Sequence, residues 1–300
     1  MNKNAPSKAF SFLEISIVIV IVGLLISAIL IGSEITADAK LAHARSLTQN
    51  SPVVSISGLA LWIDTTSEKS FSKSESKEGA TISRWNDINP ESSVANYFGN
   101  TSVTASDHPT YKESCINGLP CLYFNGTAGS KLTSPRSLGI RTKYISAFLV
   151  FTGPGNASSI YSSQLFKSST TAAWNTSSGI FQFVTSTPDK YFFYDMPGGY
   201  GVQNNRTSLA ILNSGQKYIY SVVDSYASST LHYVNGGAAV TSGVGNSGAI
   251  TKSLEVVGIG NASFQGNLGE IIIFTKALTV AERKSIEQYL GKKWGIAISS

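Results

Sequence analysis

Charged residues are scarce in this sequence of 300 residues, because Asp, Glu, Lys and Arg together make up only 14% of it. The net charge of +5 is not gathered into a cluster, and no basic run is longer than Lys292-Lys293. A protein that binds nucleic acid carries a basic patch or stripe facing the phosphates. The charge pattern therefore argues against a DNA or RNA partner.

Cysteine is scarce too, and the two that occur, Cys115 and Cys121, flank the turn-forming stretch INGLP. Asn-Gly and Pro favour a tight turn, which would bring the two thiols together. In an exported domain such a pair forms a disulfide, worth on the order of 2 kcal/mol for so short a ring. Two buried thiols are the alternative.

Charge is absent altogether from residues 15–32, which form an apolar run near the length of a membrane-spanning helix. Lys3 and Lys8 precede this run, and Glu34 is the first charge after it. By the positive-inside rule the N-terminus lies in the cytoplasm and the rest of the chain outside. A secretory signal peptide is one interpretation, since Ala-Asp-Ala at 37–39 offers a cleavage site. A plain anchor is a second.

A third interpretation explains more of the residues. Residues 1–9 form a basic leader that ends in a small residue, and Phe10-Ser11-Phe12-Leu13-Glu14 then opens the apolar helix. This segment resembles the N-terminus of type IV prepilins and pseudopilins. The resemblance implies that a prepilin peptidase cuts between Ala9 and Phe10 and methylates the new amine. The family usually has Gly at the position of Ala9.

The resemblance also implies a role for Glu14. A carboxylate at the edge of lipid is costly unless it is paired. In the family, the glutamate of one subunit meets the N-terminal amine of a neighbouring pilin-like subunit during assembly. Two alternatives are contact with lipid headgroups and pairing with the amine of its own chain.

The helix is expected to extend beyond the membrane, because residues 33–50 are rich in helix formers. Pro52 marks its end, so residues 10–52 form one long helical region. Many pilins carry a helix-breaking Pro about two-thirds along the apolar part, whereas here there is only Gly23 and Gly32. Residues 53–300 then form a separate outer domain.

Short segments rich in β-branched and aromatic residues, separated by turn formers, predict strands throughout this domain. They lie at residues 58–64, 144–152, 179–185, 190–195, 217–224, 229–235, 254–260 and 269–274. Residues 67–79 are polar and predict a solvated loop. Near the end, Thr279 and Glu282 fit a capping box, which predicts a helix with Gly291 at its C-terminal stop.

The outer domain resembles the concanavalin A-like lectin/glucanase superfamily, in particular its laminin-G-like branch. The matching stretches are GLALWID (58–64), ISRWND (82–87), PTY (109–111), INGLPCLYFNG (116–126), STLHYVNG (229–236) and FQGNLGEIIIFTKALTVAERKSIEQYLGKKWGI (264–296). The fold implied is all-β: a two-sheet antiparallel jelly-roll sandwich, preceded by the long N-terminal helix and closed by a short C-terminal helix.

Some members of that superfamily are glycoside hydrolases, which need two carboxylates flanking the scissile bond. In the glucanases the two acids lie along one strand. Here the candidate strands carry single acids, Glu255 and Glu270, while Asp64 and Asp87 are expected to end strands or cap turns. The sequence therefore predicts that the protein is not an enzyme.

The sequence gives only weak signals for residues that bind a ligand or a metal ion. One polar stretch contains the candidate sugar-binding residues Tyr200, Asn204, Asn205 and Arg206. An exposed tyrosine ring there could stack on a sugar while the amides and the guanidinium form hydrogen bonds. The alternative is that the aromatic residues of this stretch fill the core. Laminin-G-like domains often bind calcium. The conceivable ligands for such a cofactor are Asp224, Asn261 and Asn267, but no loop concentrates acids.

These observations favour a minor pilin-like subunit that displays a lectin-like domain for adhesion or ligand recognition. It would reside in the inner (cytoplasmic) membrane with its C-terminal domain outside, and then in an extracellular filament. The alternatives are a pseudopilin of a secretion or DNA-uptake machine, whose domain binds other subunits, and an anchored glycoside hydrolase.

Overall fold

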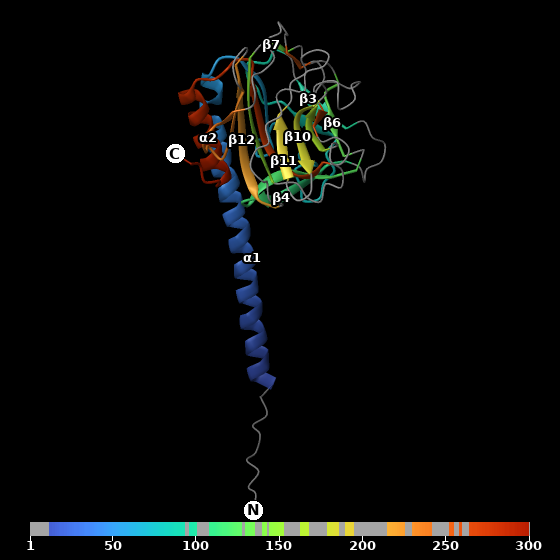
Figure 1. Ribbon diagram of the computed structural model, residues 1–300. Helices are drawn as coiled ribbons and strands as arrows, with labels where there is room; N and C mark the ends of the chain where they lie inside the picture. Colours follow the sequence, from blue (N-terminus) through green and yellow to red (C-terminus); the bar gives the residue numbers. More distant parts are fainter. Residues whose placement is uncertain are drawn as a thin grey trace, which may run out of the picture.

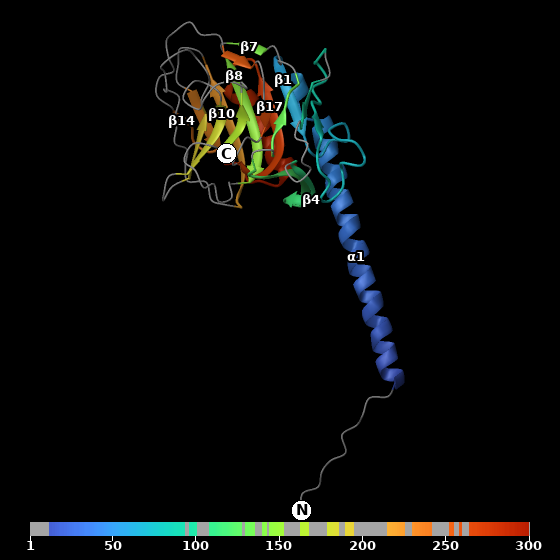
Figure 2. The same ribbon diagram turned by 90° about the vertical axis from the view of Figure 1, so that its right-hand side faces the viewer.

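The structure, a computed structural model, describes residues 12–93, 96–100, 108–127, 130–135, 140–142, 144–152, 163–167, 179–185, 190–194, 215–225, 230–241, 252–254, 258–259 and 264–299. One long helix, α1 (Phe12–Gln49), projects from a head made of β-sheets (Figure 1). Figure 2 shows the same projection from the side, so only the last part of the helix lies against the head.

Helix α1 has 38 residues and is about 57 Å long at 1.5 Å per residue. Its sequence holds no proline, and its hydroxyl groups do not interrupt it. Ser16, Ser27 and Thr36 donate hydrogen bonds to backbone carbonyls one turn earlier, at 2.8, 2.9 and 2.7 Å. The apolar segment therefore satisfies these side chains internally. The 3₁₀ helix η1 (Pro52–Ser55) follows at the predicted end.

Within the described residues the head contains two large sheets and a two-stranded ribbon, and every strand pair is antiparallel. The first sheet comprises β14 (Val240–Thr241), β13 (Thr230–Val234), β12 (Lys217–Asp224), β8 (Ile145–Thr152), β17 (Gln265–Phe274), β5 (Leu119–Asn125) and β4 (Thr110–Ile116), with β1 (Leu59–Asp64) also paired to β17. The second comprises β11 (Lys190–Tyr194), β10 (Gly179–Thr185), β9 (Ser163–Lys167), β16 (Gly258–Ile259), β6 (Leu132–Thr133), β3 (Tyr97–Gly99) and β2 (Arg84–Asn86). The ribbon pairs β15 (Lys252–Leu254) with β7 (Ile140–Thr142).

The first sheet is buried on both faces, and β8 shows why. All eight of its residues are buried, and its six apolar residues divide between two apolar clusters. Leu149 and Phe151 join the core between the two sheets, together with Trp85 of the second sheet. Phe148 and Val150 join a cluster on the outer face, under the helices. A nearly continuous apolar strand is the sequence pattern that two-sided burial requires.

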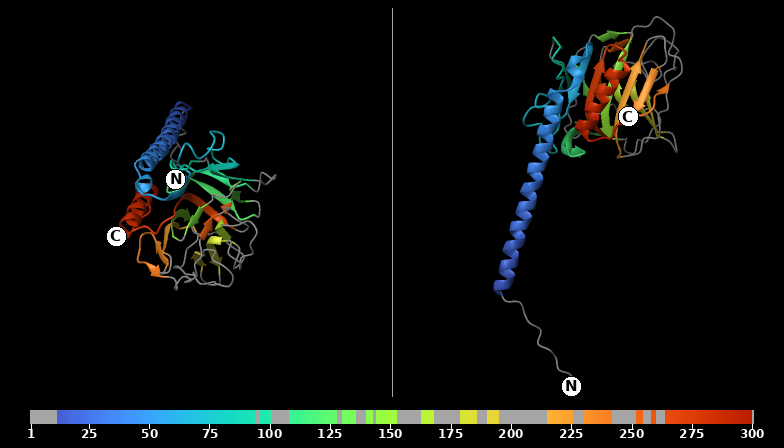
Figure 3. Two further views of the ribbon diagram at one scale, coloured as in Figure 1. Left: turned by 90° about the horizontal axis from the view of Figure 1, so that it is seen from above. Right: turned by 90° about the vertical axis from the view of Figure 1, so that its left-hand side faces the viewer.

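Helix α2 (Val280–Trp294) covers that outer face beside the end of α1 (Figure 3). Its predicted capping box is present: the Thr279 side chain accepts from the Glu282 backbone N–H, and the Glu282 side chain accepts from the Thr279 backbone N–H. The predicted stop at Gly291 is wrong, because α2 continues to Trp294 and ends on Gly295 in the left-handed region (φ 62°). Gly291 is buried inside the helix, where an added Cβ would lie 2.5 Å from Ile298.

Two other local predictions need correction. The segment 254–260 is not one strand, since Leu254 ends β15 of the ribbon while Gly258 begins β16 of the second sheet. The segment 67–79 is not wholly solvated, because Ser70 and Phe71 are buried and the Ser70 hydroxyl donates to the backbone carbonyl of Asp64. In both cases the structure depends on contacts with distant parts of the head, which the local sequence pattern does not predict.

Candidate functional site

The N-terminal half of α1 is an apolar surface that the rest of the described chain leaves uncovered. Every residue from 17 to 29 is exposed, with Leu24 at 66% and Ile29 at 70% exposure. An 18-residue window of this helix has a mean hydropathy of 3.0. By length and composition, the helix can serve as a membrane anchor or as a signal sequence.

The residues predicted for processing and assembly lie at the start of this helix. Glu14 is exposed in the first turn of α1. Ala9 and Phe10 lie outside the described residues.

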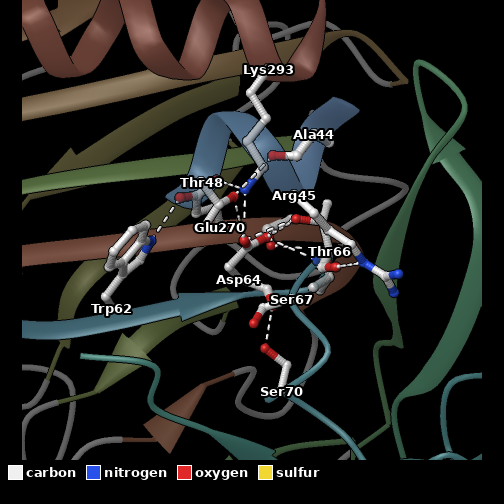
Figure 4. Close-up of polar contacts among 12 residues, drawn as sticks. Ala44, Arg45, Thr48, Trp62, Asp64, Thr66, Ser67, Ser70, Glu270 and Lys293 are labelled. Carbon is white, nitrogen blue, oxygen red and sulfur yellow. Dashed lines mark hydrogen bonds and ion pairs between the residues drawn. The ribbon is translucent and has the colours of Figure 1, made fainter. Parts of the chain in front are cut away.

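The C-terminal end of α1 docks on the head. Ala44 is buried in the outer cluster, and Leu47 packs against it. Arg45 donates from Nε to the backbone carbonyl of Thr66 at 2.9 Å and pairs through Nη1 with Glu68 at 2.7 Å. Apolar contacts and one cation therefore hold the last turns of the helix on the head, and Figure 4 shows Ala44 and Arg45 there.

A buried ion cluster lies directly beneath this docking point (Figure 4). The Lys293 ammonium on α2 lies 2.7 Å from Asp64 Oδ2 and 2.7 Å from Glu270 Oε2. All three side chains have 0% exposure. We call Asp64, Glu270 and Lys293 the buried triad.

Glu270 has a donor for every lone pair that its two oxygens present. Oε1 accepts from Trp62 Nε1 and from the Tyr289 hydroxyl, both at 2.8 Å. Oε2 accepts from Trp294 Nε1 at 2.8 Å, in addition to Lys293. Indole N–H groups can only donate, so this carboxylate sits in a cage built for an anion.

Asp64 is held by α1 and by its own turn. Thr48 of α1 donates to Oδ2 at 3.1 Å, and the Thr66 backbone N–H donates to Oδ1 at 2.9 Å. The Thr66 hydroxyl lies 2.8 Å from Oδ1 and 2.9 Å from Oδ2. The buried triad therefore joins the long helix to β1, β17 and α2.

Strand register and helical spacing bring these groups together. Asp64 and Glu270 are directly paired across β1 and β17. Tyr289 and Lys293 stand one turn apart on α2, so both reach the same carboxylate. A register shift in β17 between Leu268 and Glu270 marks a β-bulge. The pairing of β17 with β5 stops at Leu268, and β1 pairs with β17 from Glu270 onward.

Burial controls the electrostatics of the triad. Desolvation raises the pKa of Glu270, and the Lys293 charge opposes that rise. Desolvation also raises the pKa of Tyr289 well above its usual value, so its hydroxyl stays neutral. Removing one member would leave an uncompensated buried charge, which costs about 3–5 kcal/mol.

A second charged cluster fixes α2 to β12 and β13, on the same face of the sheet as the buried triad. The Glu287 carboxylate accepts from Ser221 of β12 and from Arg283 one turn earlier on α2. The Arg283 guanidinium stacks 3.7 Å from the centre of the Tyr233 ring of β13. Helix α2 is thus tied to strands at both ends of its length.

A disulfide joins Cys115 to Cys121, with the two Cα atoms 5.9 Å apart, across the β4–β5 hairpin. Asn117 (φ 53°) and Gly118 (φ 80°) form the left-handed turn between them. The Asn117 amide donates to the backbone carbonyl of Trp294 at 2.8 Å, so the hairpin caps the end of α2.

The structure describes only two of the residues predicted to bind a ligand or a metal ion. Tyr200, Asn204, Asn205, Arg206 and Asn261 lie outside the described residues. Asp224 pairs with Ile145 at one end of β8, whereas Asn267 bonds Thr152 at the other end. The structure therefore does not bring Asp224 and Asn267 together, and calcium binding stays a prediction. The described residues contain no group of three or more His, Cys, Asp or Glu side chains placed to hold a metal ion.

Reasoning from the sequence missed the triad. Asp64 does end a strand and bond its own turn, as predicted, but Lys293 was noted only as one of two adjacent lysines and was assigned no partner. One signal was available: Glu270 stands directly before three isoleucines in a strand, and a fully buried acid requires a buried cation. Which cation it meets depends on the tertiary fold.

No protein-family model and no curated protein matches this chain. Solved structures do match. Trypanosoma rangeli sialidase in complex with sialic acid is 12% identical, with a TM-score of 0.49, over 81% of this chain and 34% of the sialidase. Domain 4 of AbnA, a GH43 extracellular arabinanase from Geobacillus stearothermophilus, in complex with arabinotriose, is 15% identical, with a TM-score of 0.46, over 77% of this chain and 97% of that domain. The chain spans about a third of the sialidase structures it matches.

The expectation that the protein is not an enzyme is contradicted, because the solved structures that match include a sialidase and a domain of an arabinanase. That expectation sought two acids along one strand. The structure instead pairs Asp64 with Glu270 across two strands. This pair is fully buried around Lys293 and closed to a substrate.

Proposed function

We propose that this protein is a minor pilin-like subunit, whose apolar helix assembles into a filament and whose head serves adhesion or ligand recognition. The observation that carries the proposal is the continuity of α1. It is uncovered and apolar over residues 17–29, and the same helix is buried in the head at Ala44. A helix of this kind anchors the subunit in lipid before assembly and in a bundle of like helices afterwards.

The proposed sequence of events follows the prepilin resemblance. A prepilin peptidase cuts between Ala9 and Phe10 in the inner membrane, with the head outside. Glu14 then pairs with the new amine of a neighbouring subunit, which removes the cost of a carboxylate in an apolar environment. Internal hydrogen bonding of Ser16, Ser27 and Thr36 supports this proposal, because no hydroxyl of these three needs water.

For the head we propose the jelly-roll connectivity of the concanavalin A-like superfamily. Two antiparallel sheets packed around a shared core support it. Carbohydrate is the ligand class we propose, on the resemblance to lectin-like domains, with Tyr200, Asn204, Asn205 and Arg206 as the predicted contacts. The size of the head supports a position at the tip of the filament or a sparse position along it, because the head is large for a repeating shaft subunit.

Filament shearing tests the assembly proposal. The full chain is expressed in cells that carry a type IV pilus system, and filaments are sheared off and probed for it. We expect the chain in the sheared fraction, and Glu14→Ala to retain it in the membrane. Glu34→Ala is the control, because Glu34 is exposed beyond the apolar run and should assemble normally. Membrane retention of the unmodified chain would contradict the proposal.

Ligand binding tests the role of the head. The full chain in detergent is applied to a glycan array and, separately, to purified pilin subunits. Glycan binding that Tyr200→Ala abolishes supports adhesion. Binding to pilin subunits alone supports the pseudopilin alternative and contradicts a lectin-like head.

A further inference from the structure

The buried triad places an amine against a carboxylate where water is excluded. Lys293 Nζ lies 2.7 Å from Asp64 Oδ2, and both side chains have 0% exposure. Trp62, Tyr289 and Trp294 close the site, and each hydrogen-bonds Glu270. An amine and a carboxyl group in contact are the reactants of an amide bond, and a dry site removes the water that would reverse the reaction. We propose that Lys293 and Asp64 join in an intramolecular isopeptide bond.

The reaction is a condensation that needs no oxidant or second reactant. The Nζ–Cγ bond forms and the Cγ–Oδ2 bond breaks. Of the three ammonium protons, one stays on the amide nitrogen, and two leave with Oδ2 as water. One positive and one negative charge disappear together, so the core is left with the Glu270 carboxylate in its cage of donors.

The hydrogen bonds of the two carboxylates indicate that Asp64, rather than Glu270, is the carboxyl partner. Loss of either Glu270 oxygen would strand a buried indole N–H, that of Trp62 or that of Trp294. Loss of Asp64 Oδ2 strands no such donor. The hydroxyls that reach it have other partners: Thr48 also donates to the backbone carbonyl of Ala44, and Thr66 also reaches Oδ1.

The contacts also supply the proton transfers. Glu270 Oε2 is in contact with Nζ and takes the first proton, which leaves a neutral, nucleophilic amine. A hydrogen-bonded path leads from Nζ itself to the leaving oxygen, through the Tyr289 hydroxyl (3.2 Å), then Thr48 Oγ1 (3.3 Å), then Asp64 Oδ2 (3.1 Å). Both departing protons, including the one that Glu270 returns to the nitrogen, reach Oδ2 along this path and leave with it as water.

The remaining Asp64 oxygen, Oδ1, is positioned for the tetrahedral intermediate. It accepts from the Thr66 backbone N–H at 2.9 Å and from the Thr66 hydroxyl at 2.8 Å. Donors aimed at an oxygen that gains charge stabilise such an intermediate. Since Thr48 belongs to α1, the path is complete only when the long helix is docked, so the bond forms after folding.

The bond would close a loop across 229 residues and link β1 to α2 at the point where α1 meets the head. Pulling on a filament acts through that point. A covalent link there keeps the head folded under load, independently of whether the filament is a pilus.

Mass spectrometry tests the proposal on the full chain, purified in detergent and reduced. We expect an intact mass lower than the sequence mass by one water, and a branched tryptic peptide that joins the Asp64 and Lys293 segments. Lys293→Met and Glu270→Gln should both show the full mass. Lys292→Met is the matched control, because Lys292 is exposed, and it should keep the deficit of one water.

Tyr289→Phe tests the proton path without removing a reactant. The phenyl ring still fills the site, so the bond should form more slowly after synthesis while the final mass stays the same. A folded, unmodified chain with the full mass and unlinked peptides would overturn the proposal. A branch at Glu270 instead of Asp64 would overturn the assignment of the partner.

Discussion

Gly269 lies against Trp294: a Cβ added to Gly269 would come 2.6 Å from the Trp294 ring. This glycine is at the bulge of β17, where β5 gives way to β1, and its carbonyl accepts from the Thr65 backbone N–H at 3.0 Å. The absent side chain lets the indole lie flat on the sheet and reach Glu270. The shape of the sheet thus positions the buried triad.

Gly269→Ala should lower the free energy of unfolding by about 1–3 kcal/mol, because the added methyl group overpacks the site. Chemical denaturation of the full chain in detergent measures this change. Gly99→Ala is the control, since its nearest contact would be 3.4 Å from the Tyr97 ring. Equal stability of the Gly269 variant and the unmodified chain would refute the packing argument.

Thr48→Val should loosen α1 from the head. The change keeps the side-chain volume but removes the hydroxyl through which α1 reaches Asp64 and the Tyr289 hydroxyl, and leaving these buried groups short of a partner costs about 1–3 kcal/mol. Limited proteolysis near residues 50–55 should become faster. Thr36→Val removes a hydroxyl that bonds only within α1, so it should leave the rate unchanged. Equal rates for both variants would contradict the docking role of Thr48.

His232 should make the head less stable in acid. Burial lowers the pKa of His232 from 6.5 to about 4. The unfolded chain takes up this proton at higher pH than the folded chain, so the free energy of unfolding falls as the pH drops from 6.5 towards 4. His232 Nδ1 shares a hydrogen bond of 2.6 Å with the Tyr220 hydroxyl, which an Asn side chain can retain.

The measurement compares denaturation curves from pH 7 to pH 4 for His232→Asn and the unmodified chain. The variant should lose less stability over this range, and the difference between the two curves isolates His232 from other groups. His43→Gln, on the exposed side of α1, should behave like the unmodified chain. Parallel curves for His232→Asn and the unmodified chain would rule out this source of acid sensitivity.

Reduction of the Cys115–Cys121 disulfide should lower the free energy of unfolding by about 2 kcal/mol, the loop-closure value for a ring of this size. A double Cys→Ser variant should match the reduced protein. Asn117→Ala tests the hairpin separately, because it removes the cap on the end of α2 without touching the disulfide. A reduced protein as stable as the oxidised one would contradict this contribution.

Local patterns predicted the two helices and the longest apolar strands, but not the short strands or β4 and β5. The uninterrupted apolar run and Pro52 predicted α1 and its end, and Thr279 with Glu282 predicted the start of α2. The strands from 217 to 224 and from 145 to 152 matched their apolar, β-branched stretches. These elements depend on residues close together in the chain, so a sequence is sufficient to find them.

The triad depends on contacts that local patterns do not encode. Asp64 and Glu270 are more than 200 positions apart and meet only through the register of β1 and β17. Lys293 follows an exposed lysine, yet it is buried, because the face of α2 that carries Lys293 packs on the sheet. Gly269 leaves room there for the Trp294 ring. The end of α2 was misplaced for the same reason, since Gly291 is required for packing against Ile298 rather than for a turn.

The N-terminal residue of the mature protein tests the central claim most directly. Mass spectrometry of the protein recovered from cells that contain a prepilin peptidase should find Phe10 first, with a methylated amine, and α1 retained. Recovery with Lys40 as the first residue would show that α1 is a signal peptide and would contradict the pilin-like account. An uncut chain that begins at Met1 would make α1 a plain anchor and would contradict it equally.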